Sequence, residues 1–91
     1  MKYFEWSEKK NEWLKAERGV GFEEAIIALT EGKLLDILLN TNQKKHPSQK
    51  IYVVEIDKYA YLVPFIEDDE KIFLKTIFPS RKATKKYIIK Q

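Results

Sequence analysis

The sequence predicts an α+β domain in which two N-terminal helices pack on an antiparallel β-sheet and a short basic helix follows. Two segments before Gly32 have helical character, and four apolar segments after it have the composition of strands. Polar turns of two and four residues separate the last three of these segments, and connections that short force antiparallel hairpins. The 91 residues fit a single domain, expected over residues 1–91.

The chain is expected to begin with a short strand and a charged helix. Lys2–Trp6 alternates and is aromatic, which is typical of an edge strand. Ser7 offers a hydroxyl N-cap to a helix expected over Glu8–Arg18, and Gly19 supplies its C-cap. The inward face of this helix is expected to consist of Trp13, Leu14 and Ala16.

A second helix is expected between Gly21 and Gly32. Its apolar residues recur at i, i+3, i+4 and i+7, which is one stripe of a 3.6-residue period. These residues are Phe22, Ala25, Ile26 and Leu29. The short segment between the two helices, Gly19-Val20-Gly21, indicates an interhelical turn because it lacks the spacing of a dinucleotide loop.

The rest of the chain is expected to form four strands and a final helix. The expected strands are Lys33–Asn40, Lys50–Asp57, Tyr59–Ile66 and Lys71–Phe78. Pro79 ends the last strand, and Ser80 can cap a helix that carries the basic C-terminal tail. The predicted order of elements is β-α-α-β-β-β-β-α.

Both faces of the predicted sheet are largely apolar, so both are expected to be covered at least in part. With even hairpin loops, one face holds Tyr52, Val54, Ile56, Tyr59, Tyr61, Val63, Phe65, Ile72, Leu74, Thr76 and Phe78. The other face then holds Ile51, Val53, Glu55, Ala60, Leu62, Pro64, Phe73, Lys75 and Ile77. Pro64 favours an edge or a bulge, and a one-residue bulge would exchange the faces after it.

The composition excludes several classes of site. The chain has no cysteine and one histidine, which excludes disulfides, thiolate catalysis, cysteine–zinc sites and histidine clusters. No metal and no cofactor are therefore expected. The N-terminal segment has no long apolar run, so we expect no signal peptide, no membrane span and a cytoplasmic location.

The most informative feature for function is the C-terminal tail. Residues 80–91 carry five cations and no acid, and they account for the whole net charge of +3. In a helix, Lys82, Lys85 and Lys86 would share a face, while Ala83, Tyr87 and Ile88 would dock on the sheet. This pattern indicates contact with a polyanion, and a solvated tail without a specific task is the alternative.

Other charged residues can contribute to such a contact. Arg81 places a bidentate phosphate-binding fork at the start of the final helix, and Arg18 and Lys44-Lys45 could extend the patch. His46 follows in the same basic loop as a candidate base, or as a surface histidine with no task. Glu55 and Lys75 are charges inside apolar strand patterns, where they could form an ion pair at the rim or flank a scissile phosphate.

Several short motifs of the chain, in this order and spacing, resemble the BrnT family. They are Phe4-Glu5-Trp6, Lys10, Gly19-Val20-Gly21-Phe22-Glu23-Glu24-Ala25 and Ser80-Arg81-Lys82-Ala83-Thr84. The resemblance covers roughly residues 3–25 and 71–87. Members of that family are toxins of type II toxin–antitoxin operons and have a RelE-like fold.

The resemblance implies an endoribonuclease that cuts RNA and stops translation. It also implies a partner, a small antitoxin with a DNA-binding part, encoded by a neighbouring gene and forming a hetero-oligomer with the toxin. Arg81 matches the arginine of the family's closing segment. The chain departs from the family at Arg18, where a histidine is usual, at Thr76, where an arginine often stands, and at Pro79-Ser80 in place of Ser-Ala.

The function predicted from the sequence is therefore metal-independent RNA cleavage by a toxin. Arg81 would neutralise the phosphate, and the backbone of the RNA would be bound by Arg18, Lys44, Lys45, Lys82, Lys85 and Lys86. His46, Glu55 and Lys75 are the acid and base candidates. One alternative is a toxin-like module that binds the antitoxin, with or without RNA, and does not cleave. Another is an interaction domain that uses the second apolar face of the sheet.

Overall fold

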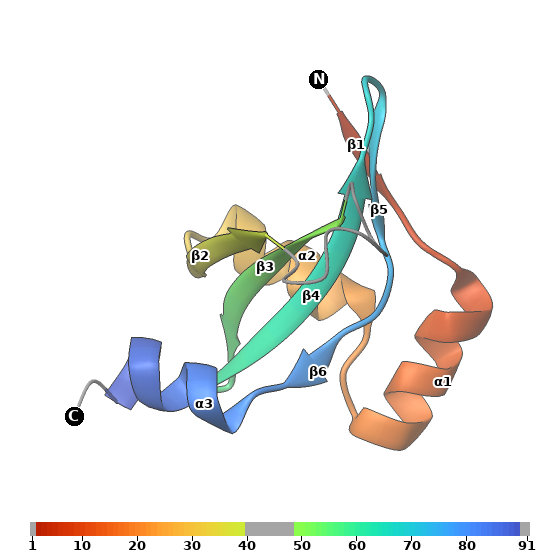
Figure 1. Cartoon of the computed structure of the whole chain (residues 1–91). Coiled ribbons are helices and arrows are strands. Elements are labelled where there is room, and N and C mark those ends of the chain that lie inside the picture. Colours follow the sequence, from red (N-terminus) through yellow and green to blue (C-terminus); the bar gives the residue numbers. More distant parts are fainter. Residues whose placement is uncertain (1, 40–48, 90–91) are drawn as a thin grey trace.

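A computed structural model describes residues 2–39 and 49–89 of the chain and has the predicted α+β architecture. Six strands, two α-helices and a C-terminal helix of mixed type follow one another along this part of the chain (Figure 1). Their bounds are β1 (Tyr3–Glu5), α1 (Glu8–Arg18), α2 (Phe22–Thr30), β2 (Leu34–Leu39), β3 (Gln49–Ile56), β4 (Tyr59–Glu67), β5 (Lys71–Leu74), β6 (Phe78–Pro79), α3 (Arg81–Ala83) and η1 (Thr84–Ile89). The label η1 marks π-helical backbone that continues α3 without a break.

The strands form one mostly antiparallel sheet in the order β1-β5-β4-β3-β2, with β6 paired to β4 beyond the end of β5. The predicted edge strand at the N-terminus is confirmed, and it runs parallel to β5. Asp57 and Lys58 form the two-residue turn between β3 and β4, and both have positive φ, as a tight hairpin turn of the primed type requires. At the β4–β5 turn, Asp68 accepts the backbone N–H groups of Glu70 and Lys71.

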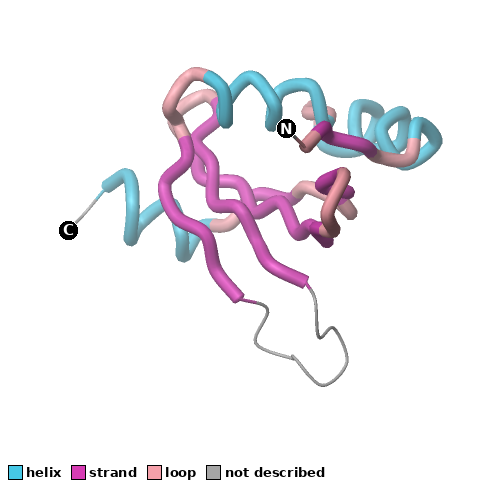
Figure 2. The backbone as a smooth tube through the Cα atoms, turned by 90° about the horizontal axis from the view of Figure 1, so that it is seen from above, coloured by secondary structure: helices cyan, strands magenta, loops and turns pink. Residues whose placement is uncertain are grey.

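Each face of the sheet is covered by a helical layer, as the sequence predicted. Figure 2 shows α1 and α2 on one side of the strands and the C-terminal helix on the other. The helix-side face, towards α1 and α2, packs strand residues against helix residues in a cluster that includes Leu14, Phe22 and Phe65. The second face packs Val53 and Ala60 against Ala83, Tyr87 and Ile88 of the C-terminal helix.

The predicted faces hold as far as Leu74 and then exchange. The strand expected over Lys71–Phe78 is two strands, β5 and β6, with an irregular segment at residues 75–77. β4 pairs Phe65 with Leu74 but Leu62 with Phe78, so four residues of the partner span three of β4. Ile77 therefore lies fully buried in the helix-side cluster, and the placement of Phe78 on that face and Ile77 on the other was wrong.

Pro64 gives the physical reason for this break. Its carbonyl accepts the backbone N–H of Lys75. Because the nitrogen and the carbonyl of one strand residue point to the same side, the Pro64 nitrogen, which carries no hydrogen, also faces the segment between β5 and β6. A regular ladder at this point would need a donor that proline lacks. The chain therefore leaves the ladder after Leu74 and returns to it one residue out of register at Phe78.

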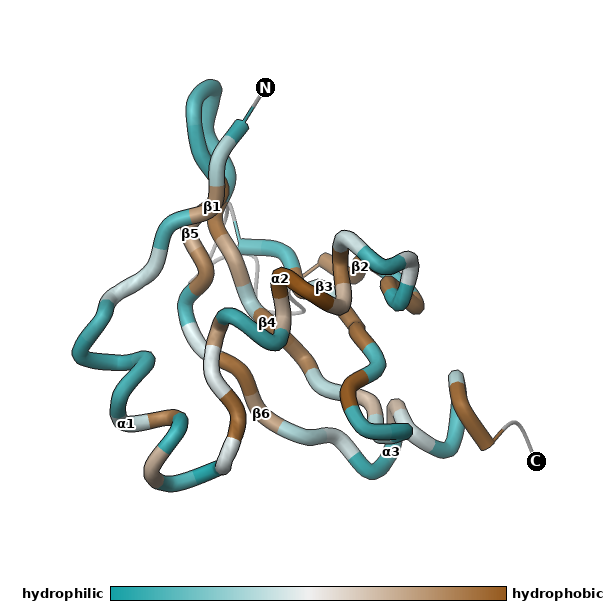
Figure 3. The backbone as a smooth tube through the Cα atoms, turned by 180° about the vertical axis from the view of Figure 1, so that it is seen from behind, coloured by the Kyte–Doolittle hydropathy of each residue, from teal (hydrophilic) through white to brown (hydrophobic). Residues whose placement is uncertain are grey.

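Helix α1 packs on the rest of the molecule through a narrow strip. Its buried side chains are Asn11 and Leu14, whereas Trp13 is 44 % exposed and Ala16 is also exposed. The expectation that Trp13 and Ala16 face inward was therefore wrong. The helix is mostly hydrophilic along its length (Figure 3). It therefore offers few side chains for burial, and most of its surface faces the solvent.

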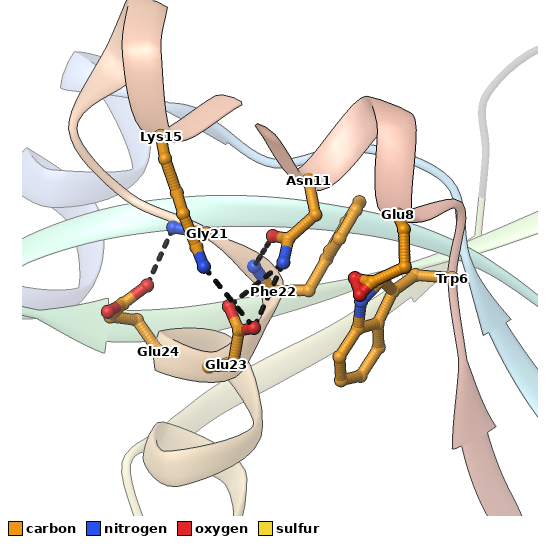
Figure 4. Close-up of polar contacts among 8 residues, drawn as sticks. All are labelled: Trp6, Glu8, Asn11, Lys15, Gly21, Phe22, Glu23 and Glu24. Carbon is orange, nitrogen blue, oxygen red and sulfur yellow. Dashed lines mark hydrogen bonds and ion pairs between the residues drawn. The ribbon is translucent and has the colours of Figure 1, made fainter. Parts of the chain in front are cut away.

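The corner between α1 and α2 is held by a buried polar network (Figure 4). The Asn11 side chain, 1 % exposed, accepts the backbone N–H of Phe22 and donates to both carboxylate oxygens of Glu23 at 3.1 and 3.0 Å. These hydrogen bonds, more than the nearby Lys15 ammonium, hold the pKa of Glu23 below its usual value. Gly21 is the N-cap of α2 and lies against the Asn11 side chain, and its N–H donates to the Glu24 carboxylate.

Candidate nucleic-acid interface

The C-terminal helix begins at a well-formed cap. The Ser80 side-chain oxygen accepts the N–H of Ala83 at 3.1 Å, and the Ser80 carbonyl accepts the N–H of Thr84 at 3.0 Å. Pro79 precedes the cap in the extended conformation. The predicted start of the helix after Pro79 is therefore confirmed. The cap at Ser80 makes Arg81 the first residue of the helix.

Two hydrogen bonds attach this helix start to β4. The N–H of Ser80 donates to the carbonyl of Ala60 at 2.9 Å, and the N–H of Ala60 donates to the Thr84 hydroxyl, also at 2.9 Å. The same Thr84 hydroxyl donates to the Ser80 carbonyl at 2.7 Å. Because Thr84 and Ala83 are nearly fully buried, the helix start is fixed to the second face and is not a loose tail.

The docking side of the helix is the one that the sequence predicted. Ala83, Tyr87 and Ile88 pack against the second face of the sheet. In addition, the Tyr87 hydroxyl donates to the carboxylate of Asp36 on β2 at 2.6 Å, across 51 residues of sequence. This bond holds the pKa of Asp36 below its usual value, with a further contribution from the N–H of Ile37, and it raises the pKa of Tyr87.

The remaining side of the helix is cationic and exposed. Arg81, Lys82, Lys85 and Lys86 are all exposed, and no ion pair within residues 2–39 and 49–89 involves any of them. Lys82 and Lys86 also line a cavity of about 270 Å³ whose walls include Leu38, Leu62, Ala83 and Tyr87. The helix therefore presents four exposed cations without an ion pair among the described residues, and Lys86 also contributes to the lowered pKa of Asp36.

The structure places the acid and base candidates at different points along β4. Glu55 on β3 lies opposite Ala60, the residue to which the helix start is bonded. Lys75 bonds through its backbone to Pro64, four residues further along β4, which corresponds to roughly 13 Å. Glu55 and Lys75 are therefore not brought together, and Glu55 is the one whose backbone pairs with the residue that anchors the helix start.

Arg18 lies on the opposite side of the sheet from the docked helix, at the end of α1. One of its terminal nitrogens donates to the Ile77 carbonyl at 2.6 Å, and its guanidinium lies 5.0 Å from the centre of the Trp13 ring. The expected basic loop with Lys44, Lys45 and His46 falls outside the described residues.

Two polar contacts of this region were not anticipated from the sequence. Asp36 is the acid that receives Tyr87, and Thr84 is the hydroxyl that joins the helix to Ala60. Neither partner is near in sequence, since the separations are 51 and 24 residues. The sequence did mark Asp36 as unusual, because it is the single charged residue in the otherwise aliphatic run Leu34–Leu39.

Two kinds of feature are absent from residues 2–39 and 49–89. Within them, no three side chains of the His, Cys, Asp or Glu type are grouped so that they could hold a metal ion. None of the helices in the same part of the chain is both long and apolar enough to cross a membrane.

The chain was also compared with known proteins. Neither the protein-family models, nor the curated protein sequences, nor the solved structures give a significant match.

Proposed function

We propose that this chain is the toxin component of a type II toxin–antitoxin system and that it cleaves RNA without a metal ion. One observation carries the proposal. The C-terminal helix is fixed to the sheet through Ala60 and displays four exposed cations, none of them in an ion pair within the described residues. The resemblance of both chain ends to BrnT toxins supports RNA as the polyanion, and the order of elements is compatible with a RelE-like fold.

The proposed chemistry is an attack of the RNA 2′-hydroxyl on the adjacent phosphate. This reaction needs a base for the 2′-hydroxyl proton, positive charge for the phosphorane, and an acid that protonates the departing 5′-oxygen. Arg81 would neutralise the phosphorane with its guanidinium, and Lys82, Lys85 and Lys86 would bind the neighbouring phosphates.

Glu55 is the acid or base candidate that the fold favours. It lies opposite Ala60, and Ala60 is bonded to Ser80 and Thr84, the residues on either side of the first turn that contains Arg81. Lys75 is bonded to Pro64, which is four residues further along β4 than Ala60, and it is therefore less well placed for a reaction at Arg81. His46 remains a sequence-based candidate in the loop outside the described residues.

Expression in a bacterial host tests the proposal. The wild-type chain is expected to arrest growth, and co-expression of the protein encoded by the neighbouring reading frame is expected to restore it. Arg81→Gln should abolish the arrest and lower RNA cleavage in EDTA by about 10²–10³-fold, as for the loss of one donor to a developing oxyanion. Lys9→Gln, which removes an exposed cation from α1, is the matched control and should still arrest growth.

Two outcomes would contradict the proposal. Normal growth together with a stable complex between this chain and the neighbouring gene product would indicate the binding module without cleavage. Normal growth with no complex and no RNA affinity at low salt would indicate an interaction domain, because phosphate-dominated binding is strongest at low salt.

A further inference from the structure

Arg18 makes a long-range contact that its expected role in RNA binding does not explain. Its Nη1 donates to the Ile77 carbonyl at 2.6 Å, although the two residues are 59 apart in sequence. The guanidinium also lies over Trp13 on the same helix, 5.0 Å from the ring centre. One cation thus joins the end of α1 to the segment between β5 and β6.

Ile77 is the buried residue of that segment. Its side chain is fully buried in the helix-side cluster, while residues 75–77 have no regular strand structure. The following strand, β6, is two residues long and pairs with β4. A strand of two residues makes few backbone hydrogen bonds to β4, so the residues next to it are weakly held. The hydrogen bond from Arg18 to the Ile77 carbonyl adds a contact at the point where the register changes.

Arg81 follows Ile77 by four residues. The fully extended chain between their Cα atoms spans at most about 14 Å, and Ser80 is bonded to Ala60 within it. The position of Ile77 therefore limits where the helix start and Arg81 can lie. A change at Ile77 would shift the start of the helix relative to Glu55, which lies opposite Ala60.

We infer that Arg18 is a positioning residue for Arg81: it holds the Ile77 carbonyl, and so the β5–β6 junction, from the end of α1. For its effect on RNA this inference rests on the proposed function. It replaces the expectation that Arg18 is a phosphate ligand of its own. The Trp13 ring supports the guanidinium in the orientation that reaches Ile77.

Amide hydrogen exchange of the free protein tests the structural part. In Arg18→Gln, exchange over residues 76–83 is expected to be at least about tenfold faster, on the scale of one lost charge-assisted hydrogen bond. Exchange at Val53 and Val54, in the centre of the sheet, should not change. Arg18→Lys keeps a donor and should lie between the wild type and Arg18→Gln, and it serves as the folded variant if Arg18→Gln does not fold. Lys9→Gln is the matched control.

A double-mutant cycle tests the effect on RNA. The probe is a single-stranded 2′-O-methyl RNA, which cannot be cleaved. If Arg18 acts through Arg81, the variant with both Arg18→Gln and Arg81→Gln should bind no more weakly than Arg81→Gln alone. If Arg18 is an independent phosphate ligand, the two losses of affinity should multiply, and Arg18→Lys should bind like the wild type.

The two measurements separate this inference from the proposed function. Unchanged exchange over residues 76–83 in both Arg18 variants overturns the positioning role, even if the wild-type chain cleaves RNA. Multiplicative losses in the cycle overturn it as well. Selectively faster exchange in a chain that neither binds nor cleaves RNA supports the contact as the anchor of the β5–β6 junction and overturns the proposed function instead.

Discussion

Gly21 occupies a position at which even one additional carbon atom would collide with its neighbours. A Cβ there would lie 2.7 Å from Asn11 Oδ1, 2.9 Å from Glu23 Oε1 and 2.9 Å from the Cε of Lys15. Its φ of −116° is accessible to any residue, so the restriction is one of space and not of backbone strain. The Lys15 side chain can move aside, whereas Asn11 is buried and bonded on both sides.

Gly21→Ala is therefore expected to destabilise the protein by about 1–3 kcal/mol, the usual cost of overpacking a buried site. Urea unfolding of the wild type and the variant would measure the difference. Gly32→Asn is the matched control, because nothing lies within 4 Å of a Cβ at that position and asparagine tolerates its φ of 75°. Equal losses of stability in the two variants would show that the contacts around Gly21 do not carry the effect.

At the scale of elements, the C-terminal helix is the part of the fold with the greatest bearing on function. Its π-helical portion, η1, still keeps Tyr87 and Ile88 on the sheet and leaves Lys85 and Lys86 exposed to solvent. The anchors are hydrogen bonds to two different strands, through Thr84 to β4 and through Tyr87 to β2. A helix so short depends on these tertiary contacts, because isolated helices of this length are marginal in water.

Loss of the Tyr87 hydroxyl should loosen the end of this helix. In Tyr87→Phe, amide exchange over Thr84–Ile89 is expected to be roughly fivefold faster at neutral pH, because Asp36 loses its phenolic donor. Because the pKa of Asp36 is lowered in the folded protein, this stabilisation is present above pH 3.8 and is lost as the pH falls through the lower folded value. The difference between wild type and variant should accordingly shrink in acid.

Tyr61→Phe is the matched control for this experiment. The Tyr61 hydroxyl takes part in no hydrogen bond recorded among residues 2–39 and 49–89, so its removal should leave exchange at Thr84–Ile89 unchanged. A difference between wild type and Tyr87→Phe that stays undiminished down to the lowest pH at which both proteins remain folded would argue that the bond to Asp36 is not its source.

At the scale of the whole molecule, the excess of positive charge comes from the C-terminal tail, because acids outnumber Lys and Arg over the rest of the chain. The net charge of +3 originates in the C-terminal tail, and the helix there packs on the second face of the sheet. The acid cluster at residues 67–70 lies at the β4–β5 turn, at the far end of β4 from the residue that anchors the helix. This separation favours the approach of a polyanion to the helix.

Salt dependence measures how many of these cations an RNA contacts. With Arg81, Lys82, Lys85 and Lys86 engaged, log K for a single-stranded, non-cleavable RNA should fall with log salt with a slope of about −3. Replacing both Lys82 and Lys86 by glutamine should reduce the slope by about 1.4. Replacing Lys9 and Lys33 instead should leave it unchanged, and a slope that responds equally to both pairs would indicate binding by diffuse charge and not by the helix.

Local chemistry was sufficient to predict most elements of this fold. Ser7 and Gly19 cap α1 as expected, with Gly19 at a φ of 70°, and Ser80 caps the last helix. The two-residue turn at Asp57-Lys58 sets the register of β3 on β4, which fixes the strand faces as far as Leu74. The docking and cationic sides of the tail followed from helical spacing alone.

Where distant segments meet, the tertiary structure decided the outcome. Asn11 is buried because Phe22 and Glu23 offer it partners from the next helix, and Trp13 is left at the surface beside Lys10 and Arg18. Pro64 shifts the register of β6 by one residue, which buries Ile77 and gives Arg18 an acceptor.

The sequence by itself thus determined the elements, their caps and the charge of the tail, because these depend on neighbours within a few residues along the chain. The tertiary structure alone decided which charges lie together. Glu55 pairs with Ala60, which anchors the helix start, whereas Lys75 bonds to Pro64, four residues further along β4. Contacts of this kind are set by strand register, and one proline is enough to change it.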